Sequence, residues 1–263
     1  MTAGPSSTDA RPRAVLVHGA VTAGRETWQA QQELAGEFEL LVPDRQGYGT
    51  DGPDRPDDPV ADAETISDLL GDGAHLVGYS MGAMAAMLAA ARRPASVRSL
   101  VLVEPPALDL VRGRADADEF VAGYEAVRAA SPDAERFLRD FLVFFGADPA
   151  EVAQIPEPMP EDMRRAAVAQ FTGAIPWEVP TPVAELAATR FPVVVVSGGH
   201  SEMFDAVCDV LADLLDADRA VIRGGGHGVQ FTGAPFNTLL RETWTSDPGT
   251  HRRSRSTGAA PRE

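Results

Sequence analysis

The amino-acid sequence predicts an α/β fold built on a mostly parallel, twisted sheet. Short apolar runs alternate with segments of helical periodicity along most of the 263 residues, which is typical of parallel strands joined by helices. The runs at 101–103 and 193–196 contain no polar residue, as expected for strands that helices cover on both faces. We expect strands at 14–17, 39–42, 75–78, 100–103, 192–196 and 219–222.

Helices are expected between these strands. The segment after the third strand is rich in Ala and Met and has helical character. The final helix is indicated by a proline at its start and by apolar residues at Phe236, Leu239, Leu240 and Trp244. The expected helices cover 27–36, 61–70, 81–93, 204–215 and 235–244.

Residues 107–190 break the alternation, because they show helical segments and little strand character. Proline-rich stretches separate helices expected at 116–130, 134–145, 161–172 and 183–189. A helical block inserted between two strands predicts a cap over the core. Its aromatic residues either line a pocket beneath the cap or form the cap's own core. These residues are Phe137, Phe141, Phe144, Phe145, Phe171 and Trp177.

We therefore divide the chain into an α/β core (13–106 and 191–245), a helical cap (107–190) and two tails. The tail at 1–12 is expected to be flexible, and it lacks the apolar stretch of a secretory signal. The tail at 246–263 has no apolar periodicity and is expected to be disordered. Because no run of about 18 apolar residues occurs, we expect no membrane span and a cytoplasmic location.

Charge and composition exclude several classes of function. A net charge of −16 and a pI near 4.7 argue against nucleic acid or an anionic membrane as the partner. All 23 basic residues are arginines, and the absence of lysine excludes a Walker A loop and a Schiff-base mechanism. The single cysteine, Cys208, lies in an apolar helical pattern and is expected to be a buried structural thiol.

The stretch Gly78-Tyr79-Ser80-Met81-Gly82 carries the strongest functional signal. It follows an apolar strand and precedes a helix, which is the context of a serine on a sharp strand-to-helix turn. Glycines on either side allow strand and helix to approach closely. Ser80 is therefore the candidate nucleophile, and it requires a base.

His227 is the best candidate for this base. It lies in a glycine-rich loop between the last strand and the last helix, where it is expected to reach Ser80. His75 is expected to be structural and His18 to shape a loop, whereas His200 is expected near the site and His251 in the tail. No pair of histidines has metal-ligand spacing, so we expect no metal.

Taken together, these stretches resemble the α/β-hydrolase-fold serine hydrolases, in particular esterases and perhydrolases with a helical cap. The resemblance runs from His18-Gly19 through Gly78–Gly82 to Gly226-His227 and includes the segment 43–49. It implies no cofactor. It also implies an oxyanion hole formed by the backbone N–H groups of Met81 and Ala20.

The acid that would orient His227 has several candidates. Relatives usually carry it after the strand that follows the cap, but Ser201 occupies that place here, with Glu202 next to it and Asp205 one turn on. Other relatives carry it after the preceding strand, where this chain has Glu104. We favour Glu104, because a carboxylate at the end of an apolar strand needs a partner. A salt bridge from Glu104 to an arginine, and a serine–histidine pair supported by water, remain alternatives.

The expected function is hydrolysis of an ester, thioester or lactone of a small, moderately apolar molecule through an acyl-enzyme. The same residues support other chemistry, because fold does not fix reaction. The alternatives are C–C bond hydrolysis, peroxyacid formation, a non-hydrolytic biosynthetic step, or a ligand receptor without catalysis. In each case the expected partner is a small molecule.

Overall fold

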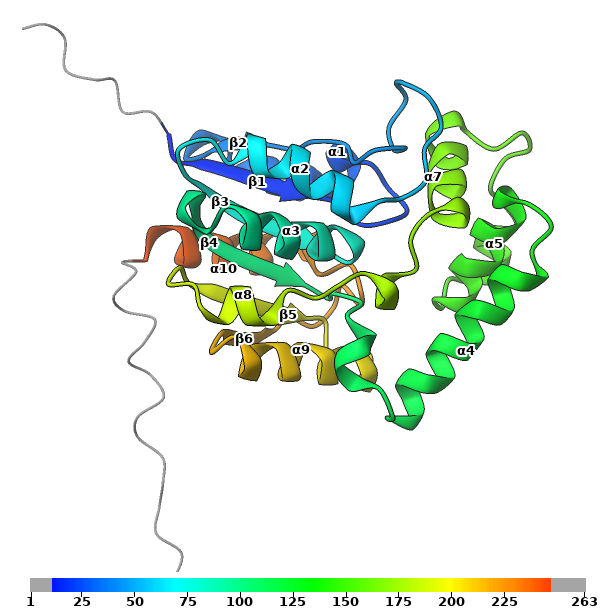
Figure 1. The fold of residues 1–263 in the computed structure, drawn as a ribbon. Coiled ribbons are helices and arrows are strands. Elements are labelled where there is room, and N and C mark those ends of the chain that lie inside the picture. The colour runs from blue at the N-terminus through cyan, green and yellow to red at the C-terminus, as the bar shows by residue number, and fades with distance from the viewer. Residues whose placement is uncertain (1–10, 247–263) are drawn as a thin grey trace, which may run out of the picture.

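The computed structural model describes residues 11–246. Within them, six parallel strands form one sheet in the order β2-β1-β3-β4-β5-β6 (Figure 1). Each expected strand coincides with one of these, so the predicted parallel sheet is confirmed. The expected tails fall almost wholly outside the described residues. The strands are β1 (Arg13–Val17), β2 (Glu39–Leu41), β3 (Ala74–Tyr79), β4 (Val97–Val103), β5 (Val193–Ser197) and β6 (Asp218–Val221).

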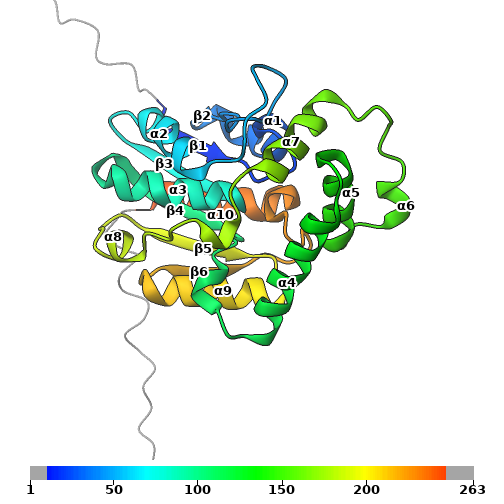
Figure 2. The same ribbon diagram turned by 45° about the vertical axis from the view of Figure 1, so that its right-hand side comes forward.

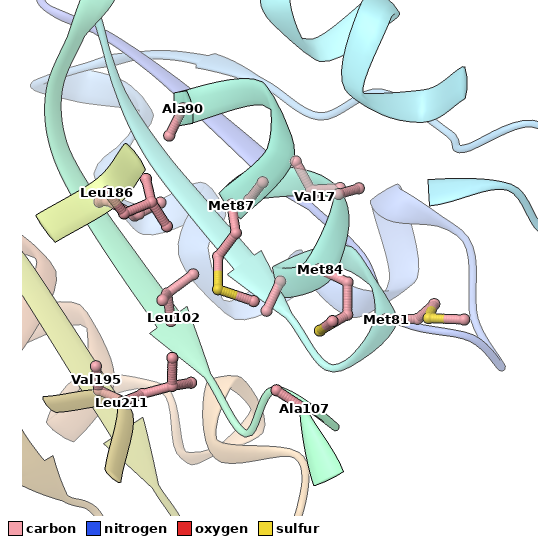
Figure 3. Close-up of a cluster of buried hydrophobic side chains, with 14 of the residues drawn as sticks. Val17, Met81, Met84, Met87, Ala90, Leu102, Ala107, Leu186, Val195 and Leu211 are labelled. Carbon is pink, nitrogen blue, oxygen red and sulfur yellow. The ribbon is translucent and has the colours of Figure 1, made fainter. Parts of the chain in front are cut away.

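Helices cover both faces of the sheet, as the uninterrupted apolar strands predicted. One face packs against α2 (Pro59–Leu69), α3 (Met81–Arg92) and α9 (Glu202–Leu214). Met81, Met84 and Met87 of α3 lie in one buried cluster with Val17 of β1 and Leu102 of β4 there (Figure 3). The other face packs against the 3-10 segment η1 (Gln29–Gly36) and α10 (Ala234–Thr245).

The α-helix expected at 27–36 is the main correction to the predicted elements. The structure has a single short turn, α1 (Gly24–Thr27), followed by the 3-10 segment η1. Gln31 of η1 is fully buried, and its Nε2 donates to the Gln230 carbonyl and to Asn237 Oδ1, each at 3.0 Å. Tertiary contacts of this kind override a helical pattern of modest amphipathicity.

Residues 107–190 form helices that stand beyond the carboxyl ends of the strands (Figures 1 and 2). α4 (Ala115–Ala130), α5 (Ala134–Phe144) and α7 (Glu161–Thr172) pack on one another, with the short α6 (Pro149–Val152) beside α5. In contrast, α8 (Val183–Ala187) packs against α3 and α9 at the sheet. No helix within residues 11–246 has the length and apolar character needed to span a bilayer.

Candidate active site

Ser80 lies between β3 and α3 in a strained backbone conformation, with φ at 52° and ψ at −124°. The flanking glycines make this turn possible. A Cβ at Gly82 would lie 2.2 Å from the His18 carbonyl oxygen, and one at Gly78 would lie 2.6 Å from the Ala83 Cα. The turn therefore projects the Ser80 hydroxyl beyond the carboxyl end of the sheet, as the pattern predicted.

The structure brings His227 to Ser80. His227 lies in the loop that follows β6, and its Nε2 is 3.0 Å from Ser80 Oγ. Phe204, Phe145 and Tyr79 surround the imidazole, with ring centroids 4.7, 5.3 and 5.2 Å away. The ring is thus held by aromatic contacts in an orientation that lets Nε2 accept the hydroxyl proton.

Glu104 completes a hydrogen-bonded chain of three side chains. It follows β4 directly, has no solvent exposure, and places Oε2 3.1 Å from His227 Nδ1. Oε1 accepts from the Gly198 backbone N–H at 2.6 Å. Because a carboxylate only accepts, Nδ1 carries the imidazole proton and Nε2 is left as the acceptor for Ser80.

Glu104 has a φ of 47°, which a non-glycine residue rarely adopts. The backbone is held by neighbouring strands, because the Glu104 N–H donates to the Val196 carbonyl at 2.9 Å. The Ser80 N–H likewise donates to the Val103 carbonyl at 2.8 Å. Ser80 and Glu104 are therefore fixed to each other through adjacent strands β3 and β4.

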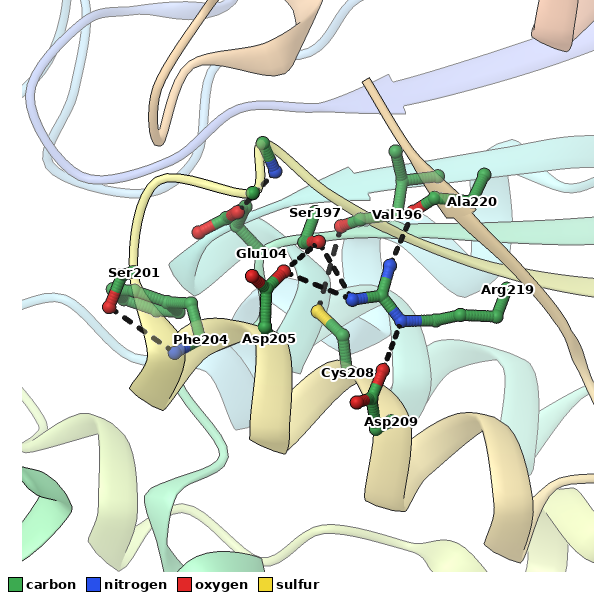
Figure 4. A network of polar contacts seen from close by, with 12 residues as sticks. Glu104, Val196, Ser197, Ser201, Phe204, Asp205, Cys208, Asp209, Arg219 and Ala220 are labelled. Atoms are coloured by element: carbon green, nitrogen blue, oxygen red, sulfur yellow. Dashed lines mark hydrogen bonds and ion pairs between the residues drawn. The ribbon is translucent and has the colours of Figure 1, made fainter. Parts of the chain in front are cut away.

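The other candidate acids have different surroundings. Asp205 accepts hydrogen bonds from the Ser197 hydroxyl and from the Arg219 guanidinium, the latter at 3.1 Å (Figure 4). Glu202 is exposed in the first turn of α9. Of the three carboxylates weighed from the sequence, Glu104 is the one that the structure places against His227.

Ala20 and Met81, the expected oxyanion donors, line the same cavity as Ser80. The loop that carries Ala20 is held by His18, whose Nε2 accepts from the Arg45 backbone N–H at 2.8 Å. Burial and the nearby Arg45 guanidinium lower the pKa of His18 to about 3. His18 is consequently a neutral structural residue near pH 7, in line with the loop-shaping role expected of it.

Gln170 of α7 reaches the same loop, a contact that the sequence did not reveal. Its Nε2 donates to the Ala20 carbonyl, and its side chain is buried. No local pattern marks this residue, because the contact joins positions 150 residues apart. Helix α7 thereby contacts the loop that is expected to bind the oxyanion.

Two cavities meet at Ser80. One, of about 50 Å³, lies beneath the helices of 107–190 and is lined largely by apolar and aromatic side chains, including Phe120, Tyr124 and Trp177. The other, of about 300 Å³, is lined by His227 and by Phe231, which is 57% exposed. Phe141 and Phe145 border both.

Some aromatic residues of 107–190 line a cavity, and others pack in the core of the helices, which are the two roles considered for them. Phe141, Phe145 and Trp177 line cavities at Ser80. Phe137 is fully buried between Tyr124 and Phe171 and forms part of the helices' own core. Cys208 is buried, as expected, and burial raises the pKa of its thiol.

Besides His18 and His227, the described residues contain two histidines, His75 and His200. His75 is buried in β3, where its Nδ1 is 2.8 Å from Ser99 Oγ. His200 lies near the site, with its ring centroid 6.1 Å from that of His227. His251 is outside the described residues.

Comparison with known proteins gives matches of two kinds. The chain is 33% identical over 129 residues to lipase LipV of Mycobacterium tuberculosis and 39% identical over 99 residues to N-formylmaleamate deformylase of Pseudomonas putida. These matches cover 47% and 35% of this chain, and they span 49% and 37% of the two curated relatives.

A solved α/β hydrolase from Sphaerobacter thermophilus superimposes with a TM-score of 0.64 at 24% identity, covering 90% of this chain and 93% of that one. This likeness confirms the fold that the resemblance implied, with its parallel sheet covered by helices on both faces. The model of the alpha/beta hydrolase family matches residues 14–239. The chain therefore belongs to the alpha/beta hydrolase family.

Proposed function

We propose that this chain is a serine hydrolase that cleaves an ester, thioester or lactone of a small, moderately apolar molecule. The observation that carries this proposal is the continuous chain of hydrogen bonds from Ser80 through His227 to Glu104, with separations of 3.0 and 3.1 Å. A serine needs such a base, and the base needs an acid that fixes its tautomer. The names of the two curated relatives, a lipase and a deformylase, also support acyl hydrolysis.

In the proposed reaction, Ser80 Oγ attacks the substrate carbonyl while His227 Nε2 takes the hydroxyl proton. The buried Glu104 carboxylate stabilises the imidazolium that forms. The backbone N–H groups of Met81 and Ala20 bind the oxyanion, a contribution worth about 10²–10³ in rate for one donor. His227 then protonates the leaving group. In the second half of the reaction His227 takes a proton from a water molecule, the water attacks the acyl-enzyme, and Ser80 is released.

The two cavities suggest where the leaving group and the acyl group of the substrate would bind. The leaving group receives its proton from His227, so it belongs in the cavity of about 300 Å³ that His227 lines. The acyl group then occupies the cavity of about 50 Å³ that Met81 lines, whereas Ala20 lines both cavities. We therefore expect a small acyl group joined to a larger leaving group.

A fluorophosphonate probe tests the nucleophile, since it labels only an activated serine. We expect labelling of the wild-type chain on Ser80 and none of Ser80→Ala, with both proteins folded by circular dichroism. An unlabelled wild-type protein would contradict the proposal. Hydrolysis in ¹⁸O-labelled water then separates hydrolysis from acyl transfer, because only hydrolysis incorporates the label into the acid product.

A series of p-nitrophenyl esters tests the assignment of the cavities. We expect kcat/KM to fall as the acyl chain lengthens from acetyl to octanoyl, because the acyl cavity is small. A preference for octanoyl esters would refute the assignment while leaving the serine mechanism intact.

A further inference from the structure

Two loops meet beside the Glu104 carboxylate. One follows β5 and carries Gly198 and His200, and the other carries Gly226 and His227. The loops are in such close contact that a Cβ at Gly198 would lie 1.9 Å from the Gly226 carbonyl oxygen. This contact brings together two histidines that are 27 positions apart, which the spacing of histidines along the chain does not reveal.

The carboxylate of Glu104 lies between the two imidazole rings. Its Oε2 is 3.1 Å from His227 Nδ1, and its Oε1 is 3.6 Å from His200 Nδ1. One ligand atom from each of the three residues lies within 4.8 Å of the other two. In a tetrahedral zinc site with bonds of about 2.0–2.2 Å, ligand atoms are roughly 3.3 Å apart. The separations of 3.1 and 3.6 Å are close to this value, but they involve the two different oxygens of the carboxylate. Binding of zinc therefore requires the partly exposed His200 ring to move toward the other two ligands, from atoms that already lie within 4.8 Å of one another.

The donor set and its surroundings favour a zinc ion. Two imidazoles and a carboxylate form one of the common open zinc sites, with water as the fourth ligand. The His200 side chain is 33% exposed, so solvent and a metal ion reach the cluster from its side. Arg223, which donates to the Gly199 carbonyl in the same loop, is exposed and its charge is therefore screened by water.

We propose that Glu104, His200 and His227 form a zinc-binding site whose occupation switches off the Ser80 relay. Zinc bound to His227 Nδ1 replaces the hydrogen bond to Glu104 Oε2. The neutral ring then carries its proton on Nε2, so the proton has moved within the ring and none is lost. A protonated Nε2 only donates, and it no longer takes the proton of Ser80. The loss of activity rests on the proposed function, whereas the binding of zinc does not.

Isothermal titration of the full chain with zinc chloride tests the site directly. We expect one zinc ion per chain in the wild type and in Ser80→Ala, because Ser80 is not a ligand. His200→Gln is expected to weaken zinc binding at least tenfold. His251→Gln is the matched control, since it removes a histidine that is not one of these three. Unchanged affinity in His200→Gln, or equal weakening in His251→Gln, would overturn the site, provided that thermal melts show folded variants.

The switch is tested by the rate of fluorophosphonate labelling and of ester hydrolysis. Each protein's rate with zinc is divided by its own rate with a chelator, so that any basal effect of the substitution cancels. We expect zinc to slow the wild type at least tenfold, reversibly, and His200→Gln much less. Full activity of the zinc-saturated wild type would refute the switch. If labelling and hydrolysis fail even without zinc, the proposed function fails, and the titration still decides the site.

Discussion

The substitution Glu104→Gln removes one negative charge and keeps the shape of the side chain. Glu104 has no solvent exposure, and its Oε2 lies 3.1 Å from His227 Nδ1. A glutamine at this position still accepts the Gly198 N–H through its carbonyl oxygen. Its NH₂ group, however, faces Nδ1 and favours the tautomer with the proton on Nε2, which does not accept from Ser80.

The expected loss follows from this geometry. Two unit charges 3.1 Å apart interact by about 5 kcal/mol at an effective dielectric constant of about 20. That energy stabilises the imidazolium, which exists only as the reaction proceeds, so its loss appears in kcat. It corresponds to a reduction of about 10³–10⁴-fold, comparable to the loss expected when an acid that orients a catalytic histidine becomes an amide.

The assay compares kcat for a short p-nitrophenyl ester at pH 7.5. Asp205→Asn is the matched control, because Asp205 is a half-buried carboxylate beside the same loop that pairs with Arg219 and Ser197. We expect Asp205→Asn to keep kcat within about threefold of the wild type. A folded Glu104→Gln protein that retains more than a tenth of the wild-type kcat would refute the assignment of the acid.

Three further results are expected. Gly82→Ala places a Cβ 2.2 Å from the His18 carbonyl oxygen, so it should lower the free energy of unfolding by about 3 kcal/mol and Tm by roughly 6–12 °C. The control Gly36→Ala meets nothing within 4 Å and should leave the thermal melt nearly unchanged. Gln170→Ala removes the donor to the Ala20 carbonyl and should lower kcat about three- to tenfold, and an unchanged kcat would show that the contact does not position the loop. Because burial lowers the pKa of His18 from 6.5 to about 3, the unfolded chain binds a proton below pH 6.5 that the folded chain does not. This group should therefore reduce the free energy of unfolding by up to about 1.4 kcal/mol per pH unit between pH 6 and pH 4, and urea unfolding that shows rising stability on acidification would contradict it.

Much of the fold follows from local patterns in the sequence. Residues 100–103 of β4 and 193–196 of β5 are all apolar, so a buried parallel sheet follows from these runs. The segment 27–36 misleads, because buried contacts of Gln31 with distant residues hold it as a 3-10 turn. The pattern of apolar residues reports burial, and it does not report such side-chain hydrogen bonds.

Some residues of the candidate site could also be predicted from the sequence, and others could not. Ser80 and His227 stand in glycine-rich turns whose sequences mark them. Glu104 could be favoured from its place at the end of a strand, but its distance to His227 depends on how β4, β5 and the glycine loop pack. Gln170 carries no sequence signal, because its partner lies far away along the chain. His200 could be expected near the site from its loop, but its closeness to Glu104 could not.

The place of Glu104, the proposed acid, directly after β4 also has a consequence for searches among related sequences. Ser80 and Glu104 are held by one pair of neighbouring strands, joined by the bond from the Ser80 N–H to the Val103 carbonyl. The turn after β5 then supplies one amide to the carboxylate and no acid of its own. A search profile that demands an aspartate there would pass over chains built like this one.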